Sequence, residues 1–229
     1  MPSPLTMPSP FPSPIYHWTT SRSRYQVQRA RFQDLYALAD LLTHCFHNRP
    51  QQPRWVYGLL RLGVSEDLRQ RLKNTDPYYV CWTVVESPDP SRCKDLPRPG
   101  EVLVATAEVD VRYPSPWQEG WTLRSPRSGY PYLSNLAVRQ EARRQGIARQ
   151  LLQVCEQTAH QWGFPTVYLH VLENNQPARQ LYEQLGYEVV RVDRSWDSWL
   201  LGRPRHIFLG KSLTPSPSPS PPLPLSTRP

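Results

Sequence analysis

The segment from Asn135 to Leu152 places the strongest constraint on how this chain can fold. Its pattern predicts a buried strand over residues 133–138, a short basic turn over residues 143–146, and an amphipathic helix that begins near Ile147. The first N–H groups of a helix have no partner within the helix and carry a partial positive charge. A basic turn that leads into such a helix end therefore predicts a binding site for an anion such as a pyrophosphate.

The residue types in this turn fit the same interpretation. Gly146 leaves room for the backbone to approach phosphate oxygens, and a Cβ atom there would hold them away. Positive charge comes from three arginines, which can bind phosphate through two N–H groups each: Arg143, Arg144 and Arg149. Gly163 and Pro165 predict the end of the helix. From the turn alone, a solvent-exposed basic helix start that binds no ligand is the alternative.

A second strand and helix follow. Residues 166–171 are rich in β-branched and aromatic side chains, which predicts a strand. Asn175 can cap a helix that has Pro177 in its first turn, and Gly186 fits the C-terminal end of that helix. Tyr182 lies on the apolar face of the same helix, where a packing role is the commoner one for an aromatic residue.

Together the two segments resemble the GCN5-related N-acetyltransferase (GNAT) family. The turn matches the acyl-CoA-binding motif R/Q-x-x-G-x-G/A at Arg143, Gly146 and Ala148, and the later segment matches N-x-x-A-x-x-L-Y-x-x-x-G-[FY] from Asn175 onward. The resemblance implies that Tyr182 is the general acid that returns a proton to the thiolate of CoA. It also implies acetyl-CoA as the acetyl donor, with no metal ion. The residues implied to bind it are Leu136, Ala137, Val138, Arg143, Arg144, Gln145, Gly146, Ile147, Ala148, Arg149 and Asn175.

The order of the predicted elements indicates one α/β domain. Besides the segments above, helices are predicted over residues 34–46 and 55–73, and strands over residues 25–31, 78–85, 102–111, 187–193 and 206–213. This order resembles the GNAT fold, a mixed, mostly antiparallel twisted sheet flanked by helices on both faces. The acetyltransferase domain is expected over residues 25–213. The Pro/Ser-rich tails at residues 1–24 and 214–229 are predicted to be disordered.

Charge and cysteine content indicate which partners and which cell compartment to expect. The net charge of +8 is compatible with nucleic-acid binding, but the chain has no nucleic-acid motif, so no such partner is expected. The four cysteines lack metal-ligand spacing, and a buried Cys155 suggests a reducing compartment. No apolar run is long enough to span a membrane. We expect a cytoplasmic protein, with an organellar one as the alternative because the acid-free, basic N-terminus is compatible with a transit peptide.

The general base is predicted from two strands. Many members of the family use a Glu on the strand before the phosphate turn, but residues 132–138 contain no carboxylate. Period-two alternation places Tyr132 on the same strand face as Ser134 and Leu136. If the next strand is adjacent, Tyr132 and His170 can share a water over the thioester. Glu108 or water is the alternative base, and a packing role is the alternative for both residues.

The acceptor amine is predicted by resemblance alone. The placement of Tyr132 and His170 resembles that in certain protein Nα-acetyltransferases. We therefore expect an N-acetyltransferase that moves the acetyl group of acetyl-CoA to a protein N-terminus or lysine by direct attack in a ternary complex. A polyamine or antibiotic acetyltransferase and a non-catalytic acyl-CoA-binding module are the alternatives. Aromatic residues of the loop at residues 112–131 either line an acceptor groove or cover the sheet edge: Tyr113, Trp117, Trp121 and Tyr130.

Overall fold

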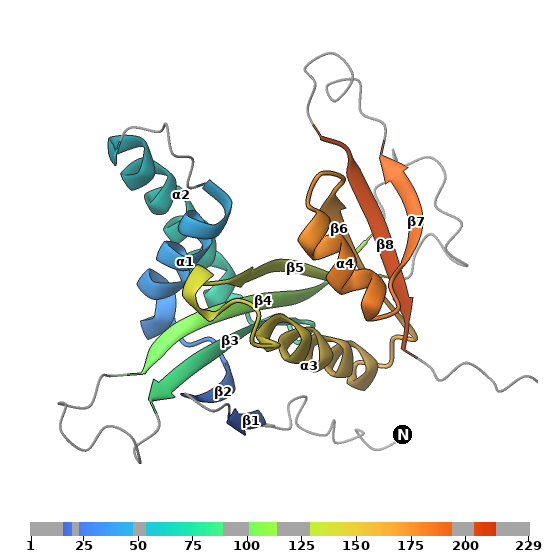
Figure 1. The fold of residues 1–229 in the computed structure, drawn as a ribbon, viewed down its shortest axis with the longest axis horizontal. Coiled ribbons are helices and arrows are strands. Elements are labelled where there is room, and N and C mark those ends of the chain that lie inside the picture. Colours follow the sequence, from blue (N-terminus) through green and yellow to red (C-terminus); the bar gives the residue numbers. More distant parts are fainter. Residues whose placement is uncertain are drawn as a thin grey trace, which may run out of the picture.

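The computed structural model of the chain describes residues 16–19, 23–47, 54–88, 101–113, 129–193 and 204–213. These residues form an eight-stranded sheet in the order β1-β2-β3-β4-β5-β6-β8-β7, flanked by helices (Figure 1). Every neighbouring pair of strands is antiparallel except β5 and β6, which are parallel. The expectation of a mixed, mostly antiparallel sheet is confirmed.

The strands agree with the predicted ones, with one addition. They are β1 Tyr16–Thr19, β2 Ser23–Arg29, β3 Tyr79–Pro88, β4 Val102–Arg112, β5 Tyr130–Val138, β6 Thr166–Leu172, β7 Glu188–Asp193 and β8 His206–Ser212. β1 pairs with β2 along its whole length, with Tyr16 opposite Val27. Because β1 lies within residues 1–24, the sheet begins before the predicted domain boundary at residue 25. Most of the remainder of that predicted tail, and all of residues 214–229, lie outside the described residues.

The described chain has four α-helices, α1 Leu35–His47, α2 Arg54–Lys73, α3 Ile147–Gln161 and α4 Gln176–Gln184, and two short 3-10 turns. The local signals that predict these helices are visible in the structure. The carboxylate of Asp34 accepts a hydrogen bond from the backbone N–H of Arg31 at 2.8 Å, at the turn that leads into α1. Gly163 after α3 and Gly186 after α4 have φ values of 87° and 83°, the left-handed conformation in which glycine commonly ends a helix.

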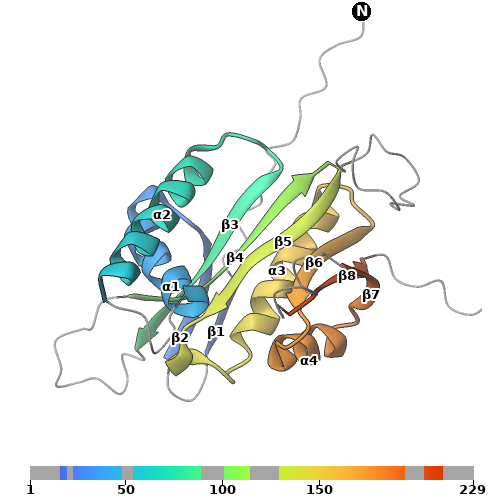
Figure 2. The same ribbon diagram turned by 90° about the horizontal axis from the view of Figure 1, so that it is seen from above.

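The helices cover opposite faces of the sheet, with α1 and α2 on one face and α3 and α4 on the other (Figure 2). On the α1/α2 face, Leu38 and Leu68 pack against Cys81 of β3. On the α3/α4 face, Leu151 and Tyr182 belong to the larger core cluster, which also contains the central strands. Both helical layers are therefore held by burial of apolar side chains, the main favourable term in folding.

The sheet diverges at its parallel pair. β5 and β6 are paired only where Tyr132 lies opposite Tyr168 and Leu133 lies opposite Leu169. Beyond these pairs β5 continues to Val138 without a partner in β6, whereas β6 pairs with β8 along its whole length. Within the described residues, the end of β5 therefore has no sheet partner on the β6 side. Its backbone groups on that side can bind another extended chain.

A β-bulge interrupts β5 just before this end. The register between β4 and β5 shifts between Thr106 and Glu108, and Asn135 has a left-handed φ of 52°. Leu133 packs in the α3/α4 core, so the alternation of the strand turns Tyr132 to the α1/α2 face. Leu136, however, also packs against the α3/α4 core. The prediction that Leu136 shares a strand face with Tyr132 is wrong, because the bulge breaks the alternation.

Candidate active site

The turn that leads into α3 has the geometry of an anion-binding turn. Arg144 and Gly146 both have left-handed φ values, 64° and 78°. Backbone turns with alternating left-handed residues can direct successive N–H groups toward an anion. Gly146 is the N-cap of α3 and has no side chain to cap the first N–H groups of the helix. Those N–H groups are therefore available to a ligand.

Backbone conformation, and not crowding inside the protein, requires glycine at position 146. A Cβ atom placed there would meet no heavy atom of the protein within 4 Å. A residue with a side chain in the left-handed region is strained by about 1–2 kcal/mol. The open space on this side of Gly146 also suits the predicted approach of phosphate oxygens.

The side chains of the turn are partly held by neighbouring elements. The guanidinium of Arg143 donates to the backbone oxygen of Val138 at 3.1 Å, which ties the turn to the end of β5. Gln145 accepts a hydrogen bond from the hydroxyl of Tyr25 in β2 at 2.7 Å. Arg149 reaches Gln184 of α4 at 3.4 Å. The structure therefore brings the predicted turn residues, the end of β5 and α4 together.

The predicted cap and the predicted apolar face of α4 are both present in the structure. Asn175 caps the helix, because its side-chain oxygen accepts from the N–H of Ala178. Tyr182 is buried, and its ring meets the ring of Tyr187 at a centroid distance of 5.6 Å. Burial, with smaller effects from Tyr132 and Cys155, raises the pKa of Tyr182 to about 12. A phenol with this pKa keeps its proton at neutral pH, as a general acid must.

Tyr132 and His170 are in direct contact. The hydroxyl of Tyr132 lies 2.9 Å from Nδ1 of His170, so the two groups are within direct hydrogen-bonding distance. The strands that carry them are adjacent, as expected, and pair at Tyr132 and Tyr168. Burial raises the pKa of Tyr132, although the nearby Arg112 acts in the opposite direction. The Tyr132 phenol therefore keeps its proton at neutral pH.

Aromatic and arginine side chains surround this pair. The ring of His170 packs on Phe208 of β8 at 4.6 Å between centroids. The guanidinium of Arg112 lies 3.6 Å from the ring centroid of Tyr132 and forms an ion pair with Asp110 at 3.0 Å. Arg112 and Asp110 are not among the predicted site residues. Their i, i+2 spacing places both on one strand face, but only the register with β5 sets Asp110 opposite Tyr132.

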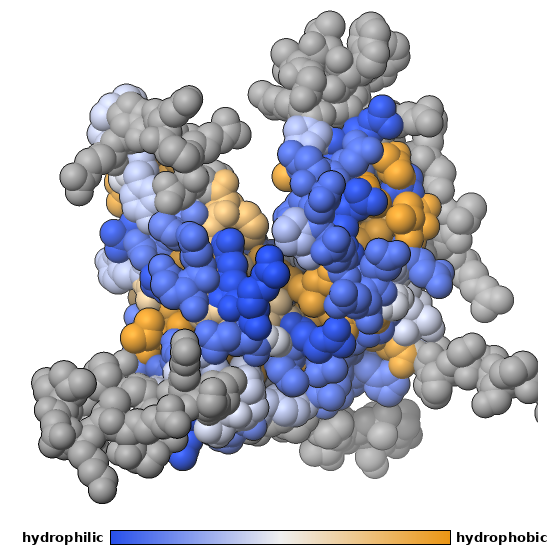
Figure 3. Space-filling model, viewed as in Figure 1, coloured by the Kyte–Doolittle hydropathy of each residue, from blue (hydrophilic) through white to orange (hydrophobic). Residues whose placement is uncertain are grey.

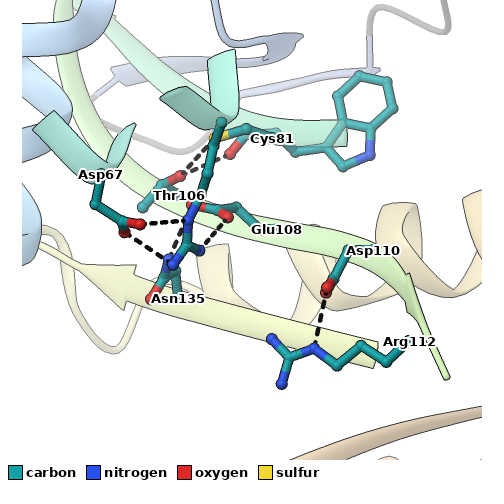
Figure 4. Close-up of polar contacts among 9 residues, drawn as sticks. Asp67, Cys81, Thr106, Glu108, Asp110, Arg112 and Asn135 are labelled. Carbon is teal, nitrogen blue, oxygen red and sulfur yellow. Dashed lines mark hydrogen bonds and ion pairs between the residues drawn. The ribbon is translucent and has the colours of Figure 1, made fainter. Parts of the chain in front are cut away.

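The alternative base, Glu108, is buried and hydrogen-bonded within the protein. Its side chain is 1% exposed, and it accepts hydrogen bonds from Arg71 and Asn135, each at 2.9 Å (Figure 4). Both carboxylate oxygens are thus occupied by donors from the protein. Asp67 binds the same guanidinium at 2.8 Å. Arg71 and Asn135 are also absent from the predicted site residues, since nothing in their local sequence pattern connects them with Glu108.

The predicted acceptor-loop aromatics fall into three groups. Tyr113 is 69% exposed, whereas Tyr130 is buried at the start of β5 and meets Tyr168 edge-on at 5.6 Å. Trp117 and Trp121 lie outside the described residues. In the space-filling view, the molecule is deeply hollowed between the part formed by α1 and α2 and the part formed by α4 and β6–β8 (Figure 3). By strand alternation, Tyr132 lies on the face of the sheet that α1 and α2 cover.

In the described part of the chain, no group of three or more His, Cys, Asp or Glu residues lies close enough together to hold a metal ion. Among the same residues, no helix is both long enough and apolar enough to cross a membrane.

The family of the chain follows from comparison with known families. A family model described as "Acetyltransferase (GNAT) family" matches residues 35–187, more than half of the 229 residues. The chain belongs to the GNAT family. GCN5-related N-acetyltransferase 10, chloroplastic, from Arabidopsis thaliana is 31% identical over 160 residues, which cover 69% of this chain and 59% of that protein. For GCN5-related N-acetyltransferase 5, chloroplastic, from the same plant, the identity is 25% over 195 residues, with 82% and 58% covered. The chain thus spans less than two thirds of these relatives.

Solved structures of other acetyltransferases share the fold. NAA60 of Arabidopsis thaliana, in complex with a bisubstrate analogue, has a TM-score of 0.55 at 22% identity, covering 82% of this chain and 98% of its own. PaiA N-acetyltransferase of Thermoplasma acidophilum, in complex with coenzyme A, has a TM-score of 0.56 at 13% identity, with 82% and 98% covered. Aminoglycoside 6'-acetyltransferase type Ii has a TM-score of 0.53 at 18% identity, with 83% and 99% covered. At these identities the likeness shows the fold alone.

Proposed function

We propose that this protein is an acetyl-CoA-dependent N-acetyltransferase whose acceptor is a protein amine, at an N-terminus or on a lysine. The observation that carries the proposal is the contact between Tyr132 and His170 at 2.9 Å, beside the point where β5 and β6 diverge. Tyr182 is a second phenol, and Tyr132 is near enough to it to raise the pKa of Tyr182. A proton acceptor and a proton donor thus lie beside the same strand end.

The acetyl donor fits the two features that frame this end of the sheet. The backbone of Leu136–Val138 lacks a strand partner on the β6 side, and a pantetheine arm with its amide groups can take that place. The turn at residues 143–149 offers uncapped N–H groups and exposed arginines to the pyrophosphate. Asn175 uses its oxygen in the helix cap, which leaves its NH₂ group as the donor toward the pantetheine arm.

The proposed proton path uses the two phenols in opposite directions. The attacking amine transfers its proton to the oxygen of Tyr132 while the phenol proton of Tyr132 passes to Nδ1 of His170, which becomes an imidazolium. The carbon–sulfur bond of the donor breaks as the new carbon–nitrogen bond is completed. Tyr182 then gives its proton to the leaving sulfur. The high pKa of Tyr182 keeps this proton available at neutral pH.

The charge near the pair supports a protein amine over a small polycation. A polyamine or aminoglycoside acceptor needs carboxylates that are free to bind ammonium groups. The carboxylate opposite Tyr132 is Asp110, and it is paired with Arg112 at 3.0 Å. Arg191 adds a second guanidinium, 5.5 Å from the ring centroid of Phe208.

The test is a pH–rate profile with an N-terminal peptide for His170→Ala, Tyr132→Phe and Glu108→Gln. We expect the first two variants to lose turnover, by about 10²–10⁴-fold, with a changed acidic limb. His160, an exposed histidine on α3, provides a matched control as His160→Ala. If only Glu108→Gln loses turnover, the proposed base is wrong. If neither peptides nor lysines are acetylated while spermidine or kanamycin is, the small-molecule alternative replaces the proposal.

The compartment is a separate proposal. The relatives named above are described as chloroplastic, which supports the organellar alternative over the cytoplasmic expectation. We therefore propose a plastid location, to be tested by import of the full chain fused to a fluorescent protein. Exclusion of the fusion from plastids would return the cytoplasmic expectation.

A further inference from the structure

Glu108 is a buried carboxylate that joins three elements of the structure. It projects from β4, is 1% exposed, and receives one hydrogen bond from α2 and one from β5 (Figure 4). The donor from α2 is Nη1 of Arg71, and the donor from β5 is Nδ2 of Asn135, each at 2.9 Å. Both oxygens of this buried carboxylate are thus bound by charged or amide donors of the protein, which leaves neither oxygen open to an attacking amine.

The bond to Asn135 acts on the bulge of β5. Asn135 is the residue in the left-handed conformation, with a φ of 52°, at the register shift beside Glu108. Asparagine tolerates this conformation better than most residues, but the conformation still needs support from its surroundings. The hydrogen bond to Glu108 supplies that support. Because the bulge sets the direction of Leu136–Val138, Glu108 controls the strand end proposed to hold the acetyl donor.

The bond to Arg71 connects the same carboxylate with α2. Arg71 lies in the last turn of α2 and is also bound by Asp67, one turn earlier, at 2.8 Å. Burial lowers the pKa of Arg71, but its two carboxylate partners outweigh this effect, and the net shift is upward. Arg71 therefore stays charged and fixed between its own helix and the sheet. Because Glu108 binds both Arg71 of α2 and Asn135 of the bulge, a shift of α2 is transmitted to the bulge through the Glu108 side chain.

We propose that Glu108 is a positioning residue that couples α2, on the acceptor side, to the β5 bulge, on the acetyl-donor side. Through Arg71–Glu108–Asn135, the position of α2 sets the backbone geometry of Leu136–Val138. This inference rests on the proposed acetyl transfer, but it holds for any acceptor amine. In this role Glu108 positions other residues and does not act as the general base.

The first test compares a conservative with a drastic change of Glu108. In Glu108→Gln, the amide oxygen can still accept from Arg71, and the amide of Asn135 can rotate to bind the new NH₂ group. We expect this variant to keep turnover within about 10-fold of the wild type, with an unchanged acidic limb of the pH–rate profile. Glu108→Ala removes both bonds. It is expected to raise the KM for acetyl-CoA and to lower kcat, by about 10- to 100-fold in kcat/KM.

Asn135→Gly isolates the bond to the bulge. Glycine adopts a φ of 52° without strain, so this variant keeps the backbone conformation and loses only the side-chain hydrogen bond. We expect a smaller rise in the KM for acetyl-CoA. In the double variant with Glu108→Ala, it should add little further loss, because both changes remove the same bond. Full additivity of the two losses would overturn the coupling.

Glu156→Ala is the matched control. Glu156 is also a nearly buried carboxylate with two donors, Tyr187 and Lys211, but it lies in α3 on the opposite face of the sheet. Its removal should lower the unfolding temperature about as much as Glu108→Ala without raising the KM for acetyl-CoA. If Glu108→Ala lowers only the unfolding temperature, or if Glu108→Gln loses turnover as completely as Glu108→Ala, the proposal is refuted. Should the wild type acetylate only a small amine, the proposed acceptor fails, and the same variants are compared on that amine.

Discussion

Replacing Gly146 by Glu tests the anion turn, with Gly163→Glu as a matched control at the other end of α3. Both glycines have left-handed φ values, and a Cβ atom at either position would meet no protein atom within 4 Å. Each substitution therefore costs about 1–2 kcal/mol of backbone strain. The helix dipole then favours a carboxylate at the N-terminus and opposes one at the C-terminus, by about 0.3–1 kcal/mol each. Gly146→Glu is expected to be the more stable variant, by about 2–6 °C in Tm.

For affinity toward acetyl-CoA, the two variants should rank in the opposite order, with Gly146→Glu the weaker binder. A carboxylate about 5 Å from a pyrophosphate charge costs about 3 kcal/mol at an effective dielectric constant of 20. This corresponds to about a 100-fold rise in Kd. Titration calorimetry at low salt, where screening is weak, should show this loss for Gly146→Glu and a near-normal Kd for Gly163→Glu. Equal Kd values for acetyl-CoA in the two variants would refute the assignment of residues 143–149 to the pyrophosphate.

Three further variants or conditions test the site and the core. Tyr182→Phe keeps the packing and removes the proton, so kcat should fall by about 10²–10⁴-fold with an unchanged Kd for acetyl-CoA; equal turnover would leave Tyr182 as a packing residue. Since the pKa of Tyr182 is raised to about 12, kcat should not fall between pH 8 and 10 through its ionisation, and an alkaline loss that Tyr182→Phe abolishes would contradict this. Leu151→Ala removes a fully buried side chain on the α3/α4 face and should cost about 2–5 kcal/mol in urea unfolding; a cost under 1 kcal/mol would argue against this packing.

The helices and most strands could be predicted from local sequence signals because the structure uses those signals directly. Asp34 bonds the turn before α1, Asn175 caps α4, and Gly163 and Gly186 end α3 and α4. β1 was missed because Tyr16–Thr19 follows a Pro/Ser-rich run that predicts disorder. Its pairing with β2, between residues five to eleven positions apart in the sequence, is what makes it a strand.

The site residues likewise fall into those that sequence signals could predict and those whose roles depend on contacts between distant parts of the chain. Tyr132 and His170 could be placed together because a crossover through α3 brings consecutive parallel strands side by side. The bulge at Asn135 could not be predicted, since a left-handed asparagine leaves no pattern in the sequence, and Leu136 was therefore assigned to the wrong face. The role of Glu108 was equally hidden, because its partner Arg71 is 37 residues away in the sequence.

The most direct test of the proposed function is identification of the acetylated product by mass spectrometry. The purified full chain is incubated with acetyl-CoA and a peptide that carries a free N-terminus and one internal lysine, with spermidine present as a competitor. We expect fragment ions to place the acetyl group on the peptide's N-terminal or lysine amine, with one equivalent of CoA thiol released per acetyl group. Acetylation of spermidine alone, or thiol release without any acetylated amine, would contradict it.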